Sequence, residues 1–114
     1  MGAYCLKKAD KLLKRSEFIR VSKSGTKIQN RHFLVIYTPA PSDRNRLGIT
    51  VTKKVGNAVI RNRIKRYVRE FFRQSAKEMN GPYDMVVIAK KEAATLSGPD
   101  ATDSLNRVFN KLSR

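Results

Sequence analysis

The sequence predicts a single α+β domain spanning residues 1–114: a small mixed sheet with helices against one face and the other face partly open. Three observations lead to this prediction. Patterns typical of strands occupy residues 32–38, 46–53 and 83–90, a long helical pattern spans residues 57–77, and shorter helical patterns stand near both ends of the chain. The 114 residues, 40% of them hydrophobic, suffice for one modest core.

The first helix is expected to follow a basic, irregular segment, residues 1–15. Ser16 can cap this helix, Glu17 suits its positive first turn, and Gly25 is expected to end it. Residues 32–38 come next and are rich in aromatic and β-branched strand formers. The chain is therefore expected to begin with a short helix and a strand.

Two prolines, a serine and an aspartate predict a loop over residues 38–45, and the strand after it alternates well. Its two faces are Leu47, Ile49 and Val51 on one side and Gly48, Thr50 and Thr52 on the other. We expect the first set to be buried and the second, small and polar, to be accessible.

A long helix is expected from a cap at Asn57 to about residue 77, before Asn80-Gly81-Pro82. Its apolar stripe consists of Ile60, Ile64, Tyr67, Val68 and Phe71. Because strands precede and follow this helix, we expect a βαβ unit with parallel strands. A connector over residues 91–100 then leads to a last helix at about residues 100–112.

The formal net charge is +16, from 25 Lys and Arg against nine Asp and Glu. Such self-repulsion favours a polyanionic partner that releases counterions on binding, with nucleic acid first and an anionic membrane surface second. No apolar run approaches the roughly 20 residues of a membrane span. The N-terminus has no apolar signal core, and the single cysteine, Cys5, cannot form an internal disulfide. We therefore expect a cytoplasmic protein.

The positive charge is concentrated on the long helix. Arg61, Lys65, Arg69 and Arg73 recur every four residues, and Arg63 and Arg66 widen the ridge. The one acid in this stretch, Glu70, can pair with Arg66. A solvated helix face usually mixes both signs, so this composition favours an RNA-binding surface, to which Asn62 adds a neutral hydrogen-bonding group.

Candidates for catalysis by side chains are few. The only histidine, His32, and the only cysteine lie far apart in sequence, there is no zinc-ligand spacing, and the glycines are isolated. His32 is expected to be structural, and no metal site of the protein's own is expected. Phe18 fits either a core position or a platform for an unpaired base, and Thr50 and Thr52 fit either plain strand surface or a floor for a single strand.

The chain resembles the bacterial ribonuclease P protein family. The central residues of the resemblance are Lys53-Lys54-Val55-Gly56-Asn57-Ala58-Val59, Arg61-Asn62-Arg63, Lys65-Arg66 and Arg69-Glu70. The flanks agree: Leu12-Leu13-Lys14-Arg15-Ser16-Glu17-Phe18, Leu47-Gly48-Ile49-Thr50-Val51 and Tyr83-Asp84-Met85-Val86-Val87-Ile88-Ala89. The resemblance covers about residues 6–112.

The resemblance implies a fold like the second domain of ribosomal protein S5, with the long helix in a left-handed βαβ crossover, although most such crossovers are right-handed. It also implies a ribonucleoprotein endonuclease. The RNA subunit, with magnesium ions that it holds itself, hydrolyses the bond that releases the 5′ leader of precursor tRNA. The protein subunit binds the catalytic RNA and holds the leader in a cleft between the first helix and the sheet.

By resemblance, the RNA-binding residues are Lys53, Lys54, Arg61, Asn62, Arg63, Lys65, Arg66 and Arg69. The leader cleft is assigned Phe18, Ser22, Ile36 and Thr50. Ser22 and Ile36 stand where relatives often carry aromatic residues, and Tyr37 should point away from the cleft. Leader contact is therefore expected to depend more on Phe18, Thr50 and the lysines.

The leading hypothesis is an electrostatic adaptor that lets two RNAs approach each other, and the protein is expected to be a monomer without RNA. Two alternatives remain. A ribosomal protein or assembly factor would explain the charge and size but not the Arg61–Arg63 motif. A self-sufficient basic nuclease would have to depend on His32.

Overall fold

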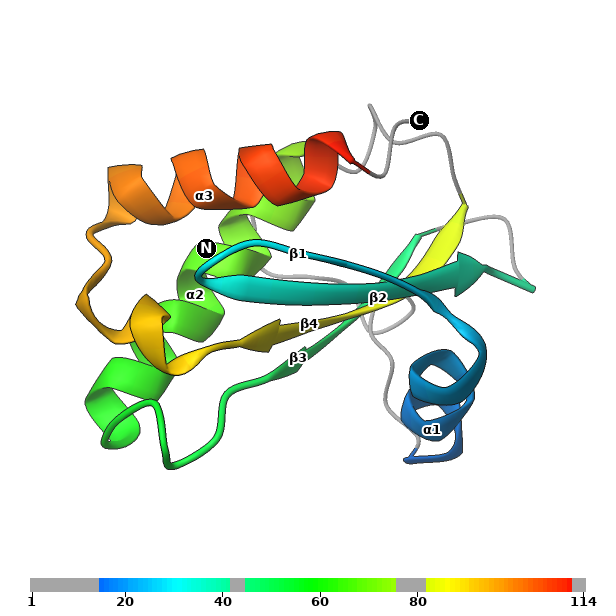
Figure 1. Ribbon diagram of the computed structural model, residues 1–114, viewed down its shortest axis with the longest axis horizontal. Coiled ribbons are helices and arrows are strands. Elements are labelled where there is room, and N and C mark those ends of the chain that lie inside the picture. The colour runs from blue at the N-terminus through cyan, green and yellow to red at the C-terminus, as the bar shows by residue number, and fades with distance from the viewer. Residues whose placement is uncertain (1–14, 42–44, 76–81, 112–114) are drawn as a thin grey trace.

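A four-stranded mixed sheet with the strand order β1-β2-β4-β3 lies at the centre of the molecule (Figure 1). The computed structural model describes residues 15–41, 45–75 and 82–111. The strands are β1 (Thr26–Gln29), β2 (Phe33–Pro39), β3 (Arg46–Thr50) and β4 (Tyr83–Ala89). The helices are α1 (Arg15–Ser24), α2 (Ala58–Ser75), the short 3-10 helix η4 (Lys91–Thr95) and α3 (Gly98–Asn110). The predicted α+β class is confirmed.

The predicted βαβ unit is confirmed, because β3 and β4 pair in parallel and α2 connects them. β2 pairs antiparallel with β4, and β1 antiparallel with β2. β1 was not predicted from the sequence. Its four residues include one apolar side chain, Ile28, and the other three are exposed, so its hydrophobic pattern is too weak to mark a strand.

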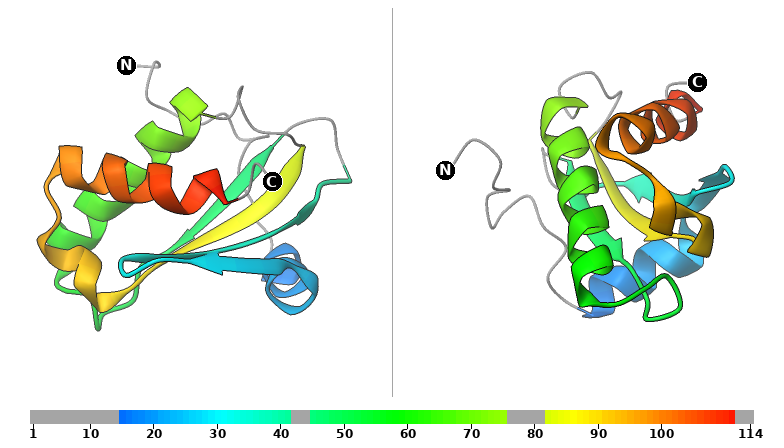
Figure 2. Two further views of the ribbon diagram at one scale, coloured as in Figure 1. Left: turned by 45° about the horizontal axis from the view of Figure 1, so that its top comes forward. Right: turned by 90° about the vertical axis from the view of Figure 1, so that its left-hand side faces the viewer.

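One face of the sheet carries the main core. α2 and α3 lie on this face, as Figure 2 shows, and their apolar sides meet the inward side chains of the strands. The ring of Phe71 in α2 contacts that of Phe109 in α3 edge to face, with centroids 5.0 Å apart. Tyr37 packs against this core as predicted, with its ring against Tyr83. The buried side of the β3 pattern is confirmed, since Leu47, Ile49 and Val51 join the core. The expectation that the other side is accessible is wrong for Gly48, which is buried because the Phe18 ring lies against it.

α1 lies on the opposite face, so the expectation of helices on one face only is wrong. Val21 of α1 is fully buried against Ile36 of β2 and Val86 of β4. Those two side chains are apolar and would be exposed without α1, which accounts for its position. α1 covers only part of the face, because Leu34, Ile88 and Thr50 remain partly exposed.

Several element ends differ from the prediction. Ser16 lies within α1 and is not its cap, whereas Gly25 does follow the end of α1 and donates its N–H to the carbonyl of Val21. β3 ends at Thr50, not at residue 53, because a turn follows it. The connector over residues 91–100 contains η4, and α3 begins at Gly98, capped by the Ser97 hydroxyl. The basic segment 1–14, including Cys5, and the predicted last turn of the long helix lie outside the described residues.

A buried carboxylate holds α1 on the sheet. Asp84 in β4 is fully buried and accepts hydrogen bonds from Arg46 Nε at 2.9 Å and Arg46 Nη2 at 2.8 Å. It also accepts a hydrogen bond from Arg20 of α1, and Arg46 reaches Glu17 of α1 at 2.6 Å. The hydrogen bond to Asp84 is the main reason that the pKa of Arg46 lies above its usual value. These ion pairs link α1, β3 and β4.

Replacing Asp84 with Asn should lower the free energy of unfolding by about 3 kcal/mol, because two arginines then lose their buried counter-charge. Denaturation with urea measures this change. The matched control is Asp103→Asn, which breaks an exposed ion pair with Arg107 and should cost less than about 0.5 kcal/mol. Equal effects of the two substitutions would show that the buried network does not hold α1.

Candidate nucleic-acid interface

The core determines which side of α2 faces outward. Ile64, Val68, Phe71 and Phe72 are buried against the sheet and α3, and Ile60 packs beside them. At 100° per residue, Asn62, Arg63, Arg66 and Arg69 fall on the other side of the helix. Lys65 lies at the edge of the apolar side, and Arg61 lies beside that side at the start of the helix. Arg66 and Asn62 are exposed, and Arg61, Arg63, Lys65 and Arg69 are half-buried. Together with Lys53 and Lys54, these residues form what we call the basic surface.

The turn before α2 extends the basic surface beyond the helix. Val55 is buried in the main core, and its N–H donates to the carbonyl of Thr52 at 3.0 Å, so the turn is anchored. Lys53 and Lys54 are exposed on its outer side. Asn57 caps α2 as predicted, since its Oδ1 accepts a hydrogen bond from the Ile60 N–H at 3.0 Å. The first turn of α2 contains no acid, so its positive helix end adds to the charge of the lysines.

Individual side chains of the basic surface contact the rest of the protein in different ways. Arg61 Nε donates to the carbonyl of Gly56 at 3.2 Å, which places Arg61 beside the turn. Arg63 Nη2 donates to the carbonyl of Ala94 in η4, also at 3.2 Å. The guanidinium of Arg66 lies 5.7 Å from the centre of the Tyr67 ring. The expected pair between Arg66 and Glu70 is not formed, because Arg66 lies over the ring instead.

Among the described residues, no acid forms an ion pair with the basic surface. Within residues 15–41, 45–75 and 82–111, the ion pairs that involve Asp84, Glu17 and Asp103 include none of its eight residues. Backbone carbonyls leave the full positive charge of a guanidinium in place. The arrangement suits a polyanion, because each phosphate that it contacts would replace a repulsion between cations with an attraction.

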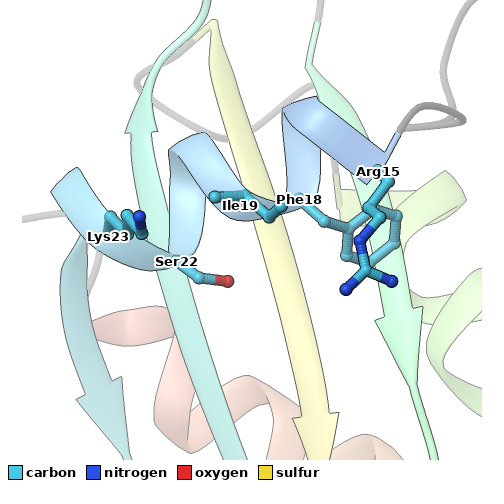
Figure 3. A pocket seen from close by; sticks show the side chains of 5 residues that line it. All are labelled: Arg15, Phe18, Ile19, Ser22 and Lys23. Atoms are coloured by element: carbon cyan, nitrogen blue, oxygen red, sulfur yellow. The ribbon is translucent and has the colours of Figure 1, made fainter.

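A groove of about 580 Å³ runs along α1 on the other side of the sheet (Figure 3). Its lining from α1 consists of Arg15, Phe18, Ile19, Ser22 and Lys23. Phe18 is half-buried, and its ring lies over Gly48 of β3. The groove thus combines an aromatic ring, a hydroxyl and two cations, groups that suit a single-stranded nucleic acid.

The four residues assigned to the leader cleft share one face of the sheet but differ in access. Phe18 and Ser22 line the groove, and Thr50 is half-buried near it on β3. Ile36 faces α1 but is only 3% exposed, because Val21 covers it. Leu34, two residues earlier on the same face, is more accessible and pairs with Ile88.

Sequence reasoning did not single out Arg15, Ile19 or Lys23 as groove residues, nor Leu34 and Ile88 beside it. The spacing of Arg15, Ile19 and Lys23 by four residues places them on one side of a helix and could have indicated a shared surface. Leu34 could not be preferred over Ile36, because both face the same way and only the path of α1 decides which is covered.

His32 occupies a structural position. Its Nδ1 lies 2.9 Å from the hydroxyl oxygen of Ser104 in α3, and the side-chain amide of Asn30 donates to the same oxygen at 3.0 Å. These contacts join the turn between β1 and β2 to α3. Among the residues that the structure describes, no three His, Cys, Asp or Glu side chains come together as a metal site. None of the described helices is long and apolar enough to cross a membrane.

Comparisons with known proteins point to one family. The family model described as Ribonuclease P matches residues 6–113. The chain is 43% identical over 114 residues to the ribonuclease P protein component of Desulforapulum autotrophicum, covering 100% of this chain and 97% of that one. It is 47% identical to the ribonuclease P protein component of Desulfosudis oleivorans, covering 100% and 94% of the two chains.

Solved structures show the same arrangement of elements. The RNase P protein of Staphylococcus aureus has a TM-score of 0.86 at 35% identity, over 94% of this chain and 100% of that one. The RNase P protein of Thermotoga maritima has a TM-score of 0.79 at 33% identity, over 91% and 96% of the two chains. The family match over nearly the whole chain, the similar structures and the unneutralised basic surface lead to one conclusion: the chain belongs to the family of ribonuclease P protein components.

Proposed function

We propose that this protein binds the catalytic RNA of ribonuclease P through its basic surface and the 5′ leader of precursor tRNA in the groove along α1. In this role it assists the magnesium-dependent endonucleolytic removal of the leader. The proposal depends on two features found in one small domain of this family. One is a basic surface that has no acidic partner among the described residues, and the other is a separate groove with an aromatic ring.

The basic surface suits a folded RNA partner. Arginine guanidiniums make forked contacts with phosphates and also stack on bases, so they bind structured RNA better than isolated lysines would. The core on the other side of α2 holds the backbone of this surface rigid, which reduces the entropy lost on binding. Released counterions would supply much of the affinity.

The groove suits an unpaired strand. A duplex cannot lay one base flat against a side chain, whereas the leader of a precursor tRNA is a free 5′ extension that can. Arg15 and Lys23 lie eight residues apart on α1, about 12 Å along its axis, with Phe18 between them. Two cations flanking a ring match the alternation of phosphates and bases in a single strand.

Bond cleavage is assigned to the RNA. Magnesium takes oxygen ligands from carboxylates and phosphates. The described carboxylates that lie near the groove, Glu17 and Asp84, are occupied by arginines, and the described residues form no cluster that fits a protein-held ion. In this proposal the protein holds no metal for the cleavage step. Its residues bind and orient the RNAs, and RNA phosphates would hold the magnesium.

The two alternatives have less support. A ribosomal role does not account for relatives that are ribonuclease P protein components along the whole chain. A nuclease centred on His32 would need a second proton-transfer group beside it, and the ring nitrogen that contacts protein is engaged with a serine that is 4% exposed.

Addition of this protein to the catalytic RNA should increase cleavage of precursor tRNA most at low magnesium, because the protein and magnesium both reduce repulsion between the RNAs. The measurement is the single-turnover cleavage rate across a magnesium titration, with and without protein. Equal rates in both series would contradict the proposal.

Arg66→Ala should weaken binding to the catalytic RNA and reduce the slope of log affinity against log salt by roughly one unit, the value for one lost phosphate contact. Arg107→Ala is the matched control, because Arg107 is an exposed arginine of α3 that pairs with Asp103 outside both surfaces. A filter-binding series at several salt concentrations measures both variants. An unchanged slope for Arg66→Ala would exclude Arg66 from the interface.

Phe18→Ala should weaken binding of precursor tRNA by the reconstituted enzyme by about tenfold, since stacking on an aromatic ring contributes roughly 1–3 kcal/mol per base. Mature tRNA, which has no leader, should bind equally well to both enzymes and serves as the control. Equal losses for the two substrates would indicate a fold defect rather than a lost leader contact.

A further inference from the structure

Beneath the Phe18 ring that lines the groove, β3 has a glycine where a strand would ordinarily carry a side chain. Gly48 lies in the middle of β3, and glycine within a strand is less stable than alanine by roughly 0.5–1 kcal/mol. Its backbone is close to the ring of Phe18. A β-carbon added to Gly48 would lie 2.5 Å from Phe18 Cζ and 2.8 Å from Cε1, well inside contact distance.

The neighbours of Gly48 show how its missing side chain affects the packing of α1. Ile36, Val86 and Gly48 lie side by side across β2, β4 and β3, beneath α1. The small side chain of Val21 packs on the first two, and the large ring of Phe18 lies where the third has no side chain. α1 can therefore keep a constant distance from the sheet, because its large residue lies opposite glycine and its small residue lies opposite larger side chains.

An added methyl group at Gly48 would displace the ring of Phe18 and not the backbone. The three atoms nearest to that position all belong to the far end of the Phe18 side chain, which can rotate away. Gly25 is different, because a β-carbon there would lie 2.5 Å from the carbonyl oxygen of Val21 and 2.9 Å from that of Tyr37. A substitution at Gly25 strains the fold, whereas one at Gly48 moves a side chain.

We infer that Gly48 is a positioning residue for the leader: its missing side chain seats the ring of Phe18 against β3 and so sets the depth and orientation of the stacking platform in the groove. This inference rests on the proposed function, and it adds a specific role for a residue that touches no RNA. Alanine at position 48 would push the ring outward into the space that the leader would occupy.

The test is a double-mutant cycle in the reconstituted enzyme, with Gly48→Ala, Phe18→Ala and the double variant. Gly48→Ala should weaken binding of precursor tRNA by about five- to tenfold, at the lower end of the range for one stacked base. In the Phe18→Ala background the same change should cost less than twofold, because no ring remains to be displaced. Mature tRNA should bind all variants equally.

Gly98→Ala is the matched control, because a β-carbon there meets only Tyr67 Cε1 at an ordinary 3.6 Å. It should leave both substrates unchanged. If Phe18→Ala loses leader affinity and Gly48→Ala does not, or if Gly48→Ala costs as much without the ring, the inference is overturned while the leader groove stands. If Phe18→Ala keeps full leader affinity, the groove itself fails and the role of Gly48 with it.

A measurement on the unmodified protein, without RNA, tests whether the Phe18 ring lies against Gly48. It applies even if Gly48→Ala folds poorly. Proton NMR should show nuclear Overhauser contacts between the ring of Phe18 and the α-protons of Gly48. In a folded Gly48→Ala variant, the ring resonances should shift while amide resonances of α2 and α3 stay in place. Absence of the contacts in the unmodified protein would overturn the inference.

Discussion

The placement of α1 depends on the ion pairs that the buried carboxylate of Asp84 forms with two arginines. α1 has one fully buried side chain, Val21, so apolar packing alone gives it a small contact with the sheet. Two arginines from different elements converge on Asp84, and one of them also reaches Glu17 of α1. A charge in the interior is tolerated only when it is paired, and here its partners join α1 to β3 and β4.

This attachment leaves the rest of that face of the sheet available. If α1 crossed further along the strands, it would cover Leu34, Ile88 and Thr50, and the groove beside Phe18 would close. The arginines that pair with Asp84 thus hold α1 at one end of the sheet face. The groove lies on the side of α1 that carries Phe18 and Ser22. Structural ion pairs and binding groups occupy different sides of one short helix.

The two surfaces are connected by continuous chain. β3 carries Gly48 beneath the Phe18 ring of the groove, the turn that follows exposes Lys53 and Lys54, and α2 then presents its arginines. The main core holds this whole segment, through Leu47, Val51, Val55 and Ile64. Fixed core contacts therefore determine the distance between groove and basic surface, as the proposed role between two RNAs requires. They also offset the repulsion that a net charge of +16 imposes on the folded state.

The sequence by itself determined the α+β class, the βαβ unit, the amphipathic α2 and the basic surface, because each depends on periodicity or composition within one segment. Motif resemblance also led to the family and to Phe18. Only the tertiary structure decided that α1 lies opposite α2 and α3, that Val21 covers Ile36 while Leu34 stays accessible, that Arg66 lies over Tyr67, and that Phe18 is seated on Gly48. Those features depend on contacts between residues distant in sequence, and no pattern within a single segment specifies them.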